Sequence, residues 1–184
     1  MRRLAIAPAS GPPEASRVVA ERIVTDRLVL APLVVGDAEE MVDVLGDDAL
    51  YEFIGGTALG LRELRDRYFE LVAGPGIPGV SWLNWIARLE ATGRAIGTVQ
   101  ATITPGKDAE QVAEVSWVIG TVCQKQGFAS EAARSLVDWL QAQGIGAIRA
   151  YIHSCHLASA TVARRAGLHQ TNELRDGEHL WRTC

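Results

Sequence analysis

The sequence predicts an α/β (α+β) domain with one central sheet that is mixed but mostly antiparallel. Residues 81–120 contain three segments rich in Val, Ile and Trp, separated by short turns, which is typical of an antiparallel meander. Residues 111–153 then read as strand, glycine-bearing loop, helix and strand. Such a crossover returns its second strand parallel to the first. The expected order of elements is therefore β-α-α-β-β-β-α-β-α-β-β.

Length and composition fit one folded domain. The chain has 184 residues, of which 48% are hydrophobic and 22% charged, so it can bury a sizeable core. Several prolines and a glycine between residues 8 and 13 predict a flexible arm over residues 1–20. Residues 21–184 are then expected to form a single domain. A homodimer is compatible with an arm that orders against a partner subunit.

The charge and the hydropathy of the chain argue against several classes of partner. The formal net charge is −4, which is a poor match to nucleic acid or to an anionic membrane. No segment approaches the roughly 20 apolar residues that span a bilayer. The three cysteines are too few and too scattered for a disulfide framework. We therefore expect a cytoplasmic protein without a nucleic-acid or membrane partner.

The first half of the chain predicts one strand and two helices. Residues 23–33 alternate apolar side chains as a strand does. The first helix follows, with Asp37 as its expected N-cap and Glu40 closing a capping box. Residues 61–72 predict a second helix, whose inward face we expect to consist of Leu61, Leu64, Tyr68, Leu71 and Val72.

The second half predicts the rest of the sheet. Strands over residues 81–89 and 94–103 are joined by a short turn, so they should form an antiparallel hairpin, and residues 111–120 should pair back against it. A strand over residues 145–153 should be followed by a short helix, residues 158–166. The chain then closes with a hairpin that turns at Asp176 and Gly177.

The stretch from residue 124 to 141 is a glycine-bearing loop that runs directly into a helix. Apolar residues recur at helical spacing along it, at Ala133, Leu136, Val137 and Leu140. A helix start carries unpaired N–H groups and partial positive charge, so it can hold a phosphate. Gly127 would let the backbone approach such an anion closely. Taken alone, the stretch is equally typical of a plain connection that binds nothing.

Five motifs in the right order resemble one family. Residues 124–129 match the pyrophosphate signature Q/R-x-x-G-x-G/A of the GNAT superfamily of acyl-CoA-dependent N-acetyltransferases. The other four resemble its Rim-type branch, which modifies the N-termini of ribosomal proteins. Residues 25–30 resemble T-x-R-L-x-L, and residues 90–97 resemble the turn between two strands of the meander. Residues 127–132 resemble G-Y/F-A-T/S-E-A, and residues 156–168 resemble N-x-x-S-x-x-V-x-x-x-x-G-F/L.

This resemblance spans residues 23–183 and implies acetyl-CoA as the acetyl donor. In a GNAT-like sheet the fourth and fifth strands splay apart at their C-terminal ends, and the donor lies in that opening. The loop would hold the pyrophosphate through its backbone N–H groups, and the fourth strand would bind the pantetheine. The implied contacts are Trp117, Val118, Ile119, Gln124, Lys125, Gln126, Gly127, Phe128, Ala129, Ser130, His156 and Ser159.

The resemblance also implies direct attack of a neutral amine on the thioester in a ternary complex. Glu114, on the fourth strand, is the first candidate for the base, because related enzymes often place one there; alternatively it is a solvated strand residue. Ser159 resembles the serine near the CoA sulfur, where it could donate to the leaving thiolate; alternatively it caps a helix. His156 stands where the family usually has Asn, and it could contact the donor, act as a base or be structural.

Three residues near the end of a predicted strand could be taken for a metal site. His153, Cys155 and His156 invite a metal site, but strand alternation points them to different faces, so we expect no metal. The function expected first is acetyl transfer to a primary amine, on either a protein N-terminus or a small molecule. An acyl-CoA-binding module with little activity is the alternative, and a structural domain without a cofactor is a third. Nothing in the sequence identifies the acceptor.

Overall fold

The computed structural model describes residues 18–106 and 110–184, so most of the predicted arm lies outside the described residues. A single sheet has the strand order β1-β2-β3-β4-β5-β6-β8-β7. Its strands are β1 (Ile23–Val24), β2 (Leu28–Pro32), β3 (Ser81–Leu89), β4 (Ala95–Pro105), β5 (Gln111–Ile119), β6 (Ala147–His153), β7 (His169–Arg175) and β8 (Glu178–Arg182). The helices are α1 (Ala38–Val44), α2 (Leu61–Ala73), α3 (Phe128–Ala142) and α4 (Leu157–Arg165). The short 3-10 turns are η1 (Val35–Asp37), η2 (Asp48–Tyr51) and η4 (Thr121–Cys123).

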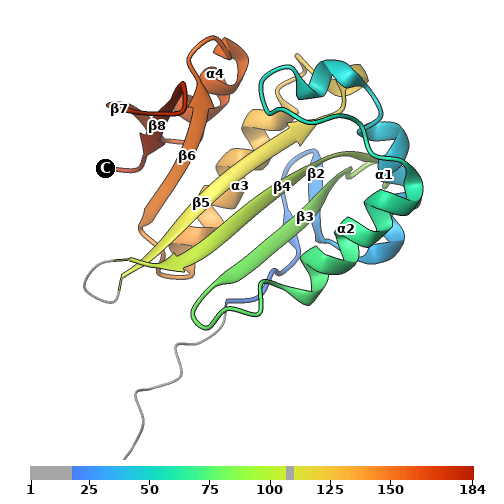
Figure 1. The fold of residues 1–184 in the computed structure, drawn as a ribbon, viewed down its shortest axis with the longest axis horizontal. Coiled ribbons are helices and arrows are strands. Elements are labelled where there is room, and N and C mark those ends of the chain that lie inside the picture. The colour runs from blue at the N-terminus through green and yellow to red at the C-terminus, as the bar shows by residue number, and fades with distance from the viewer. Residues whose placement is uncertain (1–17, 107–109) are drawn as a thin grey trace, which may run out of the picture.

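The helices cover the two faces of the sheet unequally (Figure 1). The larger core lies between α3 and the sheet, where Leu136 and Leu140 are completely buried among side chains of the central strands. The smaller core joins α1 and α2 to the opposite face, around Met41 and Ile86. This second layer reaches only part of its face, so the middle of the sheet is left open on that side.

The predicted meander and crossover are confirmed. β3, β4 and β5 pair antiparallel in sequence, and β5 pairs parallel with β6. That parallel ladder runs only from the pair Val112–Ala147 to the pair Glu114–Arg149. Beyond it β5 continues to Ile119 against β4, and β6 continues against β8. The two strands therefore separate toward their C-terminal ends, as Figure 1 shows, and the predicted splay is confirmed.

The start of the chain differs from the prediction. The strand expected over residues 23–33 is broken into β1 and β2 by a tight turn, in which the Thr25 N–H donates to the carbonyl of Leu28. The predicted capping box of α1 is also wrong. The Glu40 carboxylate accepts from the backbone N–H of Ala95 instead, and Arg88 donates to both Glu40 and Asp37. Both carboxylates of the predicted box are thus bound by Arg88, while Asp37 also accepts from the Val34 N–H.

The inward face of α2 is narrower than predicted. Leu64, Tyr68 and Leu71 are buried, as expected. Leu61 and Val72, however, are 38% and 52% exposed, so they do not belong to the core. The reason is that α2 contacts the sheet from one side only, and a helix at the margin of a layer buries a single row of side chains.

Candidate active site

The start of α3 has the geometry of an anion site. Gly127 is the N-cap, with φ of +86°, a conformation that glycine adopts without steric cost. The first hydrogen bond of the helix runs from the Glu131 N–H to the Gly127 carbonyl, over 3.1 Å. The N–H groups of Phe128, Ala129 and Ser130 therefore have no acceptor within the helix. Together with the helix dipole, three such donors favour a bound phosphate group.

The opening between β5 and β6 leads to this helix start. From Val115 to Ile119, the edge of β5 that faces β6 has no pairing partner in the parallel ladder. Two short segments connect that strand to the helix: η4 and the loop that contains Lys125, whose φ is +60°. The Gln124 side chain ties the loop back, because its amide donates to the Ile119 carbonyl over 2.9 Å. The free edge of β5 and the loop thus form one continuous stretch of backbone that ends at the N–H groups of the α3 start.

Ser159 lies across the opening from β5. Its hydroxyl oxygen accepts a hydrogen bond from the indole N–H of Trp117 at 3.0 Å. An indole N–H can only donate, so the serine oxygen must be the acceptor and its own proton remains available for another partner. The helix-cap interpretation of Ser159 is wrong, because the N-cap of α4 is His156.

His156 is held by a contact that the sequence did not indicate. Its ring stacks on Phe53, with centroids 4.4 Å apart and an angle of 15° between the planes, and Phe53 also lies 5.6 Å from the ring of His153. Burial lowers the pKa of His156, the neighbouring His153 adds to this, and Glu52 opposes it. The imidazole is therefore neutral at neutral pH, able to donate and accept as an asparagine amide does.

Glu114 lies at the closed end of the opening. It forms the last pair of the parallel ladder with Arg149, whose guanidinium is 3.2 Å from its carboxylate. The carboxylate is 45% exposed and points to the open face, since its neighbours Ala113 and Val115 pack into the α3 core. Within the described residues its side chain bonds to Arg149 and not to Trp117 or Ser159. The structure thus groups the loop, the C-terminal part of β5 and α4, whereas Glu114 lies on the part of β5 that is still paired with β6.

A model of the acetyltransferase (GNAT) domain matches residues 27–169 of the sequence. The chain belongs to the GNAT acetyltransferase family. It is accordingly an N-acetyltransferase, and acetyl-CoA is its acetyl donor. The motif resemblance to that family is confirmed. A search of curated proteins gave no matching relative.

Solved structures share the fold of this GNAT chain at low sequence identity. RimL, the ribosomal L7/L12 alpha-N-protein acetyltransferase in complex with coenzyme A, is 18% identical with a TM-score of 0.71, over 88% of this chain and 95% of that one. An acetyltransferase from Agrobacterium tumefaciens is 22% identical with a TM-score of 0.67, over 100% and 99%. The microcin C7 self-immunity acetyltransferase MccE, in complex with acetyl-CoA and AMP, is 13% identical with a TM-score of 0.72, over 86% and 93%.

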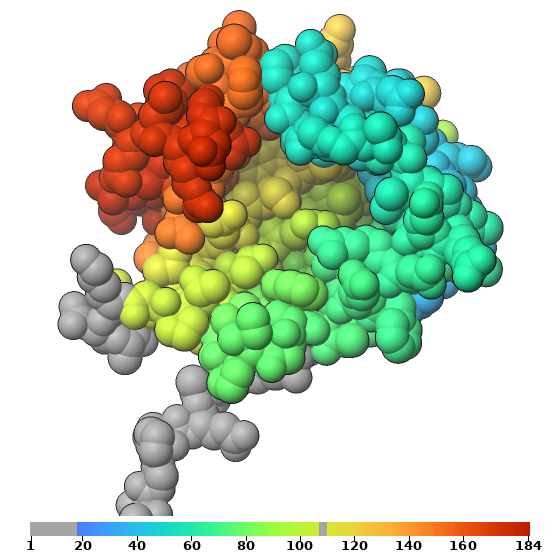
Figure 2. Space-filling view, viewed as in Figure 1, coloured from blue at the N-terminus to red at the C-terminus, as the bar shows by residue number. Residues whose placement is uncertain are grey.

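The open face of this GNAT sheet is hollowed. Figure 2 shows a depression floored by β4 and β5, between α2 and the segment before it on one side and the C-terminal hairpin on the other. Gln100 and Ser116 pair across these two strands on the open face, and the serine hydroxyl donates to the glutamine side chain over 3.4 Å. The floor therefore offers neutral hydrogen-bonding groups, with Glu114 and Arg149 balancing each other at its margin.

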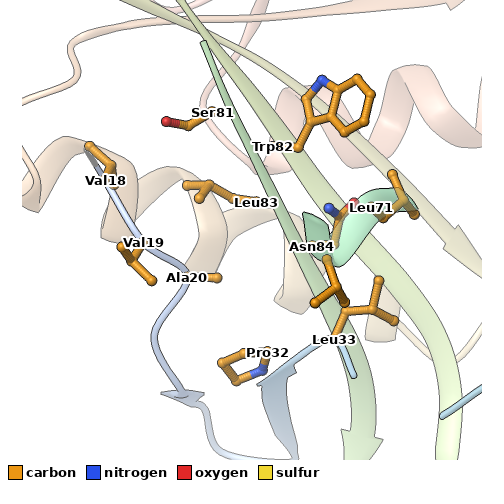
Figure 3. Close-up of a pocket in the computed structure, with 11 residues that line it drawn as sticks. Val18, Val19, Ala20, Pro32, Leu33, Leu71, Ser81, Trp82, Leu83 and Asn84 are labelled. Carbon is orange, nitrogen blue, oxygen red and sulfur yellow. The ribbon is translucent and has the colours of Figure 1, made fainter. Parts of the chain in front are cut away.

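A separate groove lies at the edge of β3, where β2 has ended (Figure 3). Its volume is about 340 Å³. Ser81 and Leu83 lie on one side of the strand, and Trp82 and Asn84 lie on the other. The remaining lining comes from the N-terminal segment, the end of β2 with the residue after it, and α2, as Val18, Val19, Ala20, Pro32, Leu33, Leu71 and Val72. No residue of the predicted acetyl-CoA site lines it, and its described side chains carry no charge.

The described residues also bear on whether the chain could hold a metal ion or cross a membrane. Over residues 18–106 and 110–184, no group of three His, Cys, Asp or Glu side chains could hold a metal ion. Instead, the Cys155 N–H donates to Nδ1 of His153 over 3.2 Å, and His153 and His156 flank Phe53. In that part of the chain no helix is long and apolar enough to cross a bilayer.

Proposed function

We propose that this enzyme acetylates a primary amine, on a protein N-terminus or a small molecule, by direct attack within a ternary complex. One observation carries the proposal. The unpaired edge of β5 leads through η4 and the loop that contains Lys125 to the N–H groups at the start of α3, while the Ser159 hydroxyl lies beside β5 with its proton available. Backbone groups of Trp117 to Ile119 would bind an extended pantetheine arm. The N–H groups from Gln126 to Ser130 would hold the pyrophosphate.

The residues of this chain have distinct roles in the proposal. Acetyl-CoA supplies the activated acetyl group. Ser159 donates its hydroxyl proton as a hydrogen bond to the leaving sulfur, because Trp117 already occupies its oxygen as a donor. A backbone N–H near Val118 stabilises the negative charge that develops on the carbonyl oxygen. The amine acceptor enters from the hollow face, over Gln100 and Ser116.

A proton must leave the amine before it attacks, since alkylamines have a pKa of about 10.4. Two side chains can receive it through water. Glu114 is tied to Arg149 at the closed end of the opening, whereas His156 is neutral and precedes the helix of Ser159. We infer that His156 is the better placed of the two. Comparing Glu114→Gln with His156→Asn decides between them, because only the true proton acceptor loses turnover while acetyl-CoA affinity stays unchanged.

The experiment for the whole proposal is a pair of measurements on the full chain. Calorimetry with acetyl-CoA measures donor binding, and release of free thiol with a panel of peptides and small amines measures transfer. Binding together with turnover of at least one amine supports the proposal. Absence of binding would refute it.

An acyl-CoA-binding module with little activity is the second candidate. The ion pair between Glu114 and Arg149 favours it, because this pairing removes the carboxylate that relatives often use as a base. Binding of acetyl-CoA without turnover of any amine across the panel would establish this second function and refute the first.

A further inference from the structure

The turn between β1 and β2 is hydrogen-bonded to the first turn of α3, although the two are about a hundred positions apart in sequence. The Thr25 hydroxyl donates to one oxygen of the Glu131 carboxylate over 2.6 Å, and the Arg27 backbone N–H donates to the same oxygen over 2.9 Å. The Arg27 guanidinium bonds the other oxygen, through Nε at 2.7 Å and Nη2 at 2.6 Å. Every acceptor position of the carboxylate that faces the turn is thus used.

The far end of the same guanidinium lies along the glycine loop. Its Nη1 donates to the carbonyl oxygen of Gln126 over 3.0 Å. Its plane covers the ring of Phe128 at 4.6 Å, and a Cβ added to Gly127 would lie 3.4 Å from Nη2. Arg27 therefore contacts Gln126 in the loop and Phe128 at the start of α3, and it lies beside Gly127 between them, in addition to bonding Glu131.

The hydrogen bond to Gln126 has a directional consequence. A trans peptide unit is planar, with its carbonyl and its N–H pointing in opposite directions. Holding the Gln126 carbonyl toward Arg27 therefore turns the Gly127 N–H to the opposite side of the loop. Rotation of this peptide would cost the bond to Arg27, so the arginine selects one of the two orientations that glycine permits.

The charge of Glu131 gives Arg27 a second role at the loop. Glu131 stands in the first turn of α3, and its carboxylate is only 17% exposed. Burial acts to raise the pKa of Glu131, but hydrogen bonds from Thr25 and Arg27 outweigh it and the pKa is lowered, so the group is ionised. An ionised carboxylate beside a phosphate site would repel the ligand. The Arg27 guanidinium neutralises it, and its planar fork reaches Glu131 and Gln126 together in a fixed geometry that the point charge of an ammonium group does not impose.

We propose that Arg27 is a positioning residue for the donor, which orients the Gln126–Gly127 peptide and neutralises Glu131 so that the loop accepts the pyrophosphate. This inference rests on the proposed placement of acetyl-CoA. It differs from a merely structural tie between β1 and α3, because it acts on the phosphate end of the donor and not on its pantetheine end.

The test compares two probes, CoA and pantetheine, which lacks the phosphates. Calorimetry measures the dissociation constant of each for the wild type, Arg27→Gln and Arg27→Lys, and steady-state rates measure KM for acetyl-CoA and kcat. We expect Arg27→Gln to weaken CoA binding and raise KM roughly tenfold or more, as for loss of hydrogen bonds to a charged group. Pantetheine binding and kcat should change by less than about twofold. Arg27→Lys should fall between the wild type and Arg27→Gln.

Arg134→Gln is the matched control, because Arg134 lies on α3, as the Glu131 partner of Arg27 does, and pairs with Asp138 at the exposed surface of that helix. If it weakens CoA binding as much as Arg27→Gln does, the effect is general charge and the inference is wrong. Equal loss of CoA and pantetheine in Arg27→Gln would also overturn it, as would unchanged CoA binding. If Arg27→Gln does not fold, Arg27→Lys decides by the same ratio of the two probes. A wild type that binds neither probe would instead refute the proposed function itself.

Discussion

Replacing Trp117 with Phe should slow acetyl transfer, and should do so only through Ser159. Phenylalanine keeps an aromatic ring at the position but lacks the N–H that donates to the serine oxygen over 3.0 Å. Loss of one such neutral hydrogen bond is worth about 0.5–1.5 kcal/mol, or about 2- to 10-fold in kcat. Ser159→Ala removes the proposed hydrogen bond to the developing thiolate, which is charged. We therefore expect a larger loss there, of about 1.5–3 kcal/mol, or roughly 10- to 150-fold.

The assay is thiol release at saturating acetyl-CoA and acceptor for both single variants and the double variant. If Trp117 acts by orienting Ser159, Trp117→Phe should have no further effect once the serine is Ala, so the double variant should equal Ser159→Ala. Thr161→Val is the control on the same helix, because the Thr161 hydroxyl donates to the Leu157 carbonyl within α4, and its kcat should be unchanged. Losses that multiply in the double variant, or a wild-type kcat for Ser159→Ala, would refute the reasoning.

Three other substitutions test separate parts of the structure. Gly127→Val should abolish CoA binding in calorimetry, whereas Gly144→Val, at a similar φ of +84° beyond the far end of α3, should cost comparable stability and leave binding intact. Because burial lowers the folded-state pKa of His156, the unfolded chain binds its proton first as the pH falls below about 6.5. The wild type should therefore have a lower free energy of unfolding at about pH 5 than at about pH 8 because of this histidine. In His156→Asn this part of the pH dependence should be absent, which urea unfolding at the two pH values measures. Arg88→Leu leaves the carboxylates of Asp37 and Glu40 with one backbone N–H donor each but without a cation, and should cost roughly 2–3 kcal/mol, lowering Tm by about 4–12 °C in a thermal melt. An unchanged melt would show that solvent replaces the arginine there.

The sequence predicted the parts of the site that depend on local order. Gly127, followed by an amphipathic pattern, indicated a helix start with free N–H groups, and the structure has the glycine at a positive φ there. The crossover from β5 to β6 followed from strand, helix and strand in succession, because handedness and direction leave few alternatives. The splay itself came from resemblance to a family, since no residue pattern marks where a ladder stops.

Contacts between distant residues could not be predicted in the same way. Asp37 and Glu40 have the spacing of a capping box, yet Arg88 on β3 is bound by both. The stacking of Phe53 on His156 joins segments about a hundred residues apart, and Phe53 lies in a passage with no periodicity. A local rule describes the cost of leaving a group unpaired. It does not state which of several donors that are distant in sequence is the partner of that group in the folded protein.

The short parallel ladder between β5 and β6 gives this sheet an edge in its interior. Strand edges usually occur at the margin of a sheet, where their unpaired backbone groups can recruit a strand from another molecule. Here the unpaired run from Val115 to Ile119 is recessed between α3 and α4 on one side and the walls of the hollow on the other. A slender arm with amide groups can enter such a slot, whereas a second polypeptide strand with full-sized side chains meets those walls. If the donor binds as proposed, the free backbone groups of β5 are accessible to the pantetheine arm and inaccessible to a strand of another molecule.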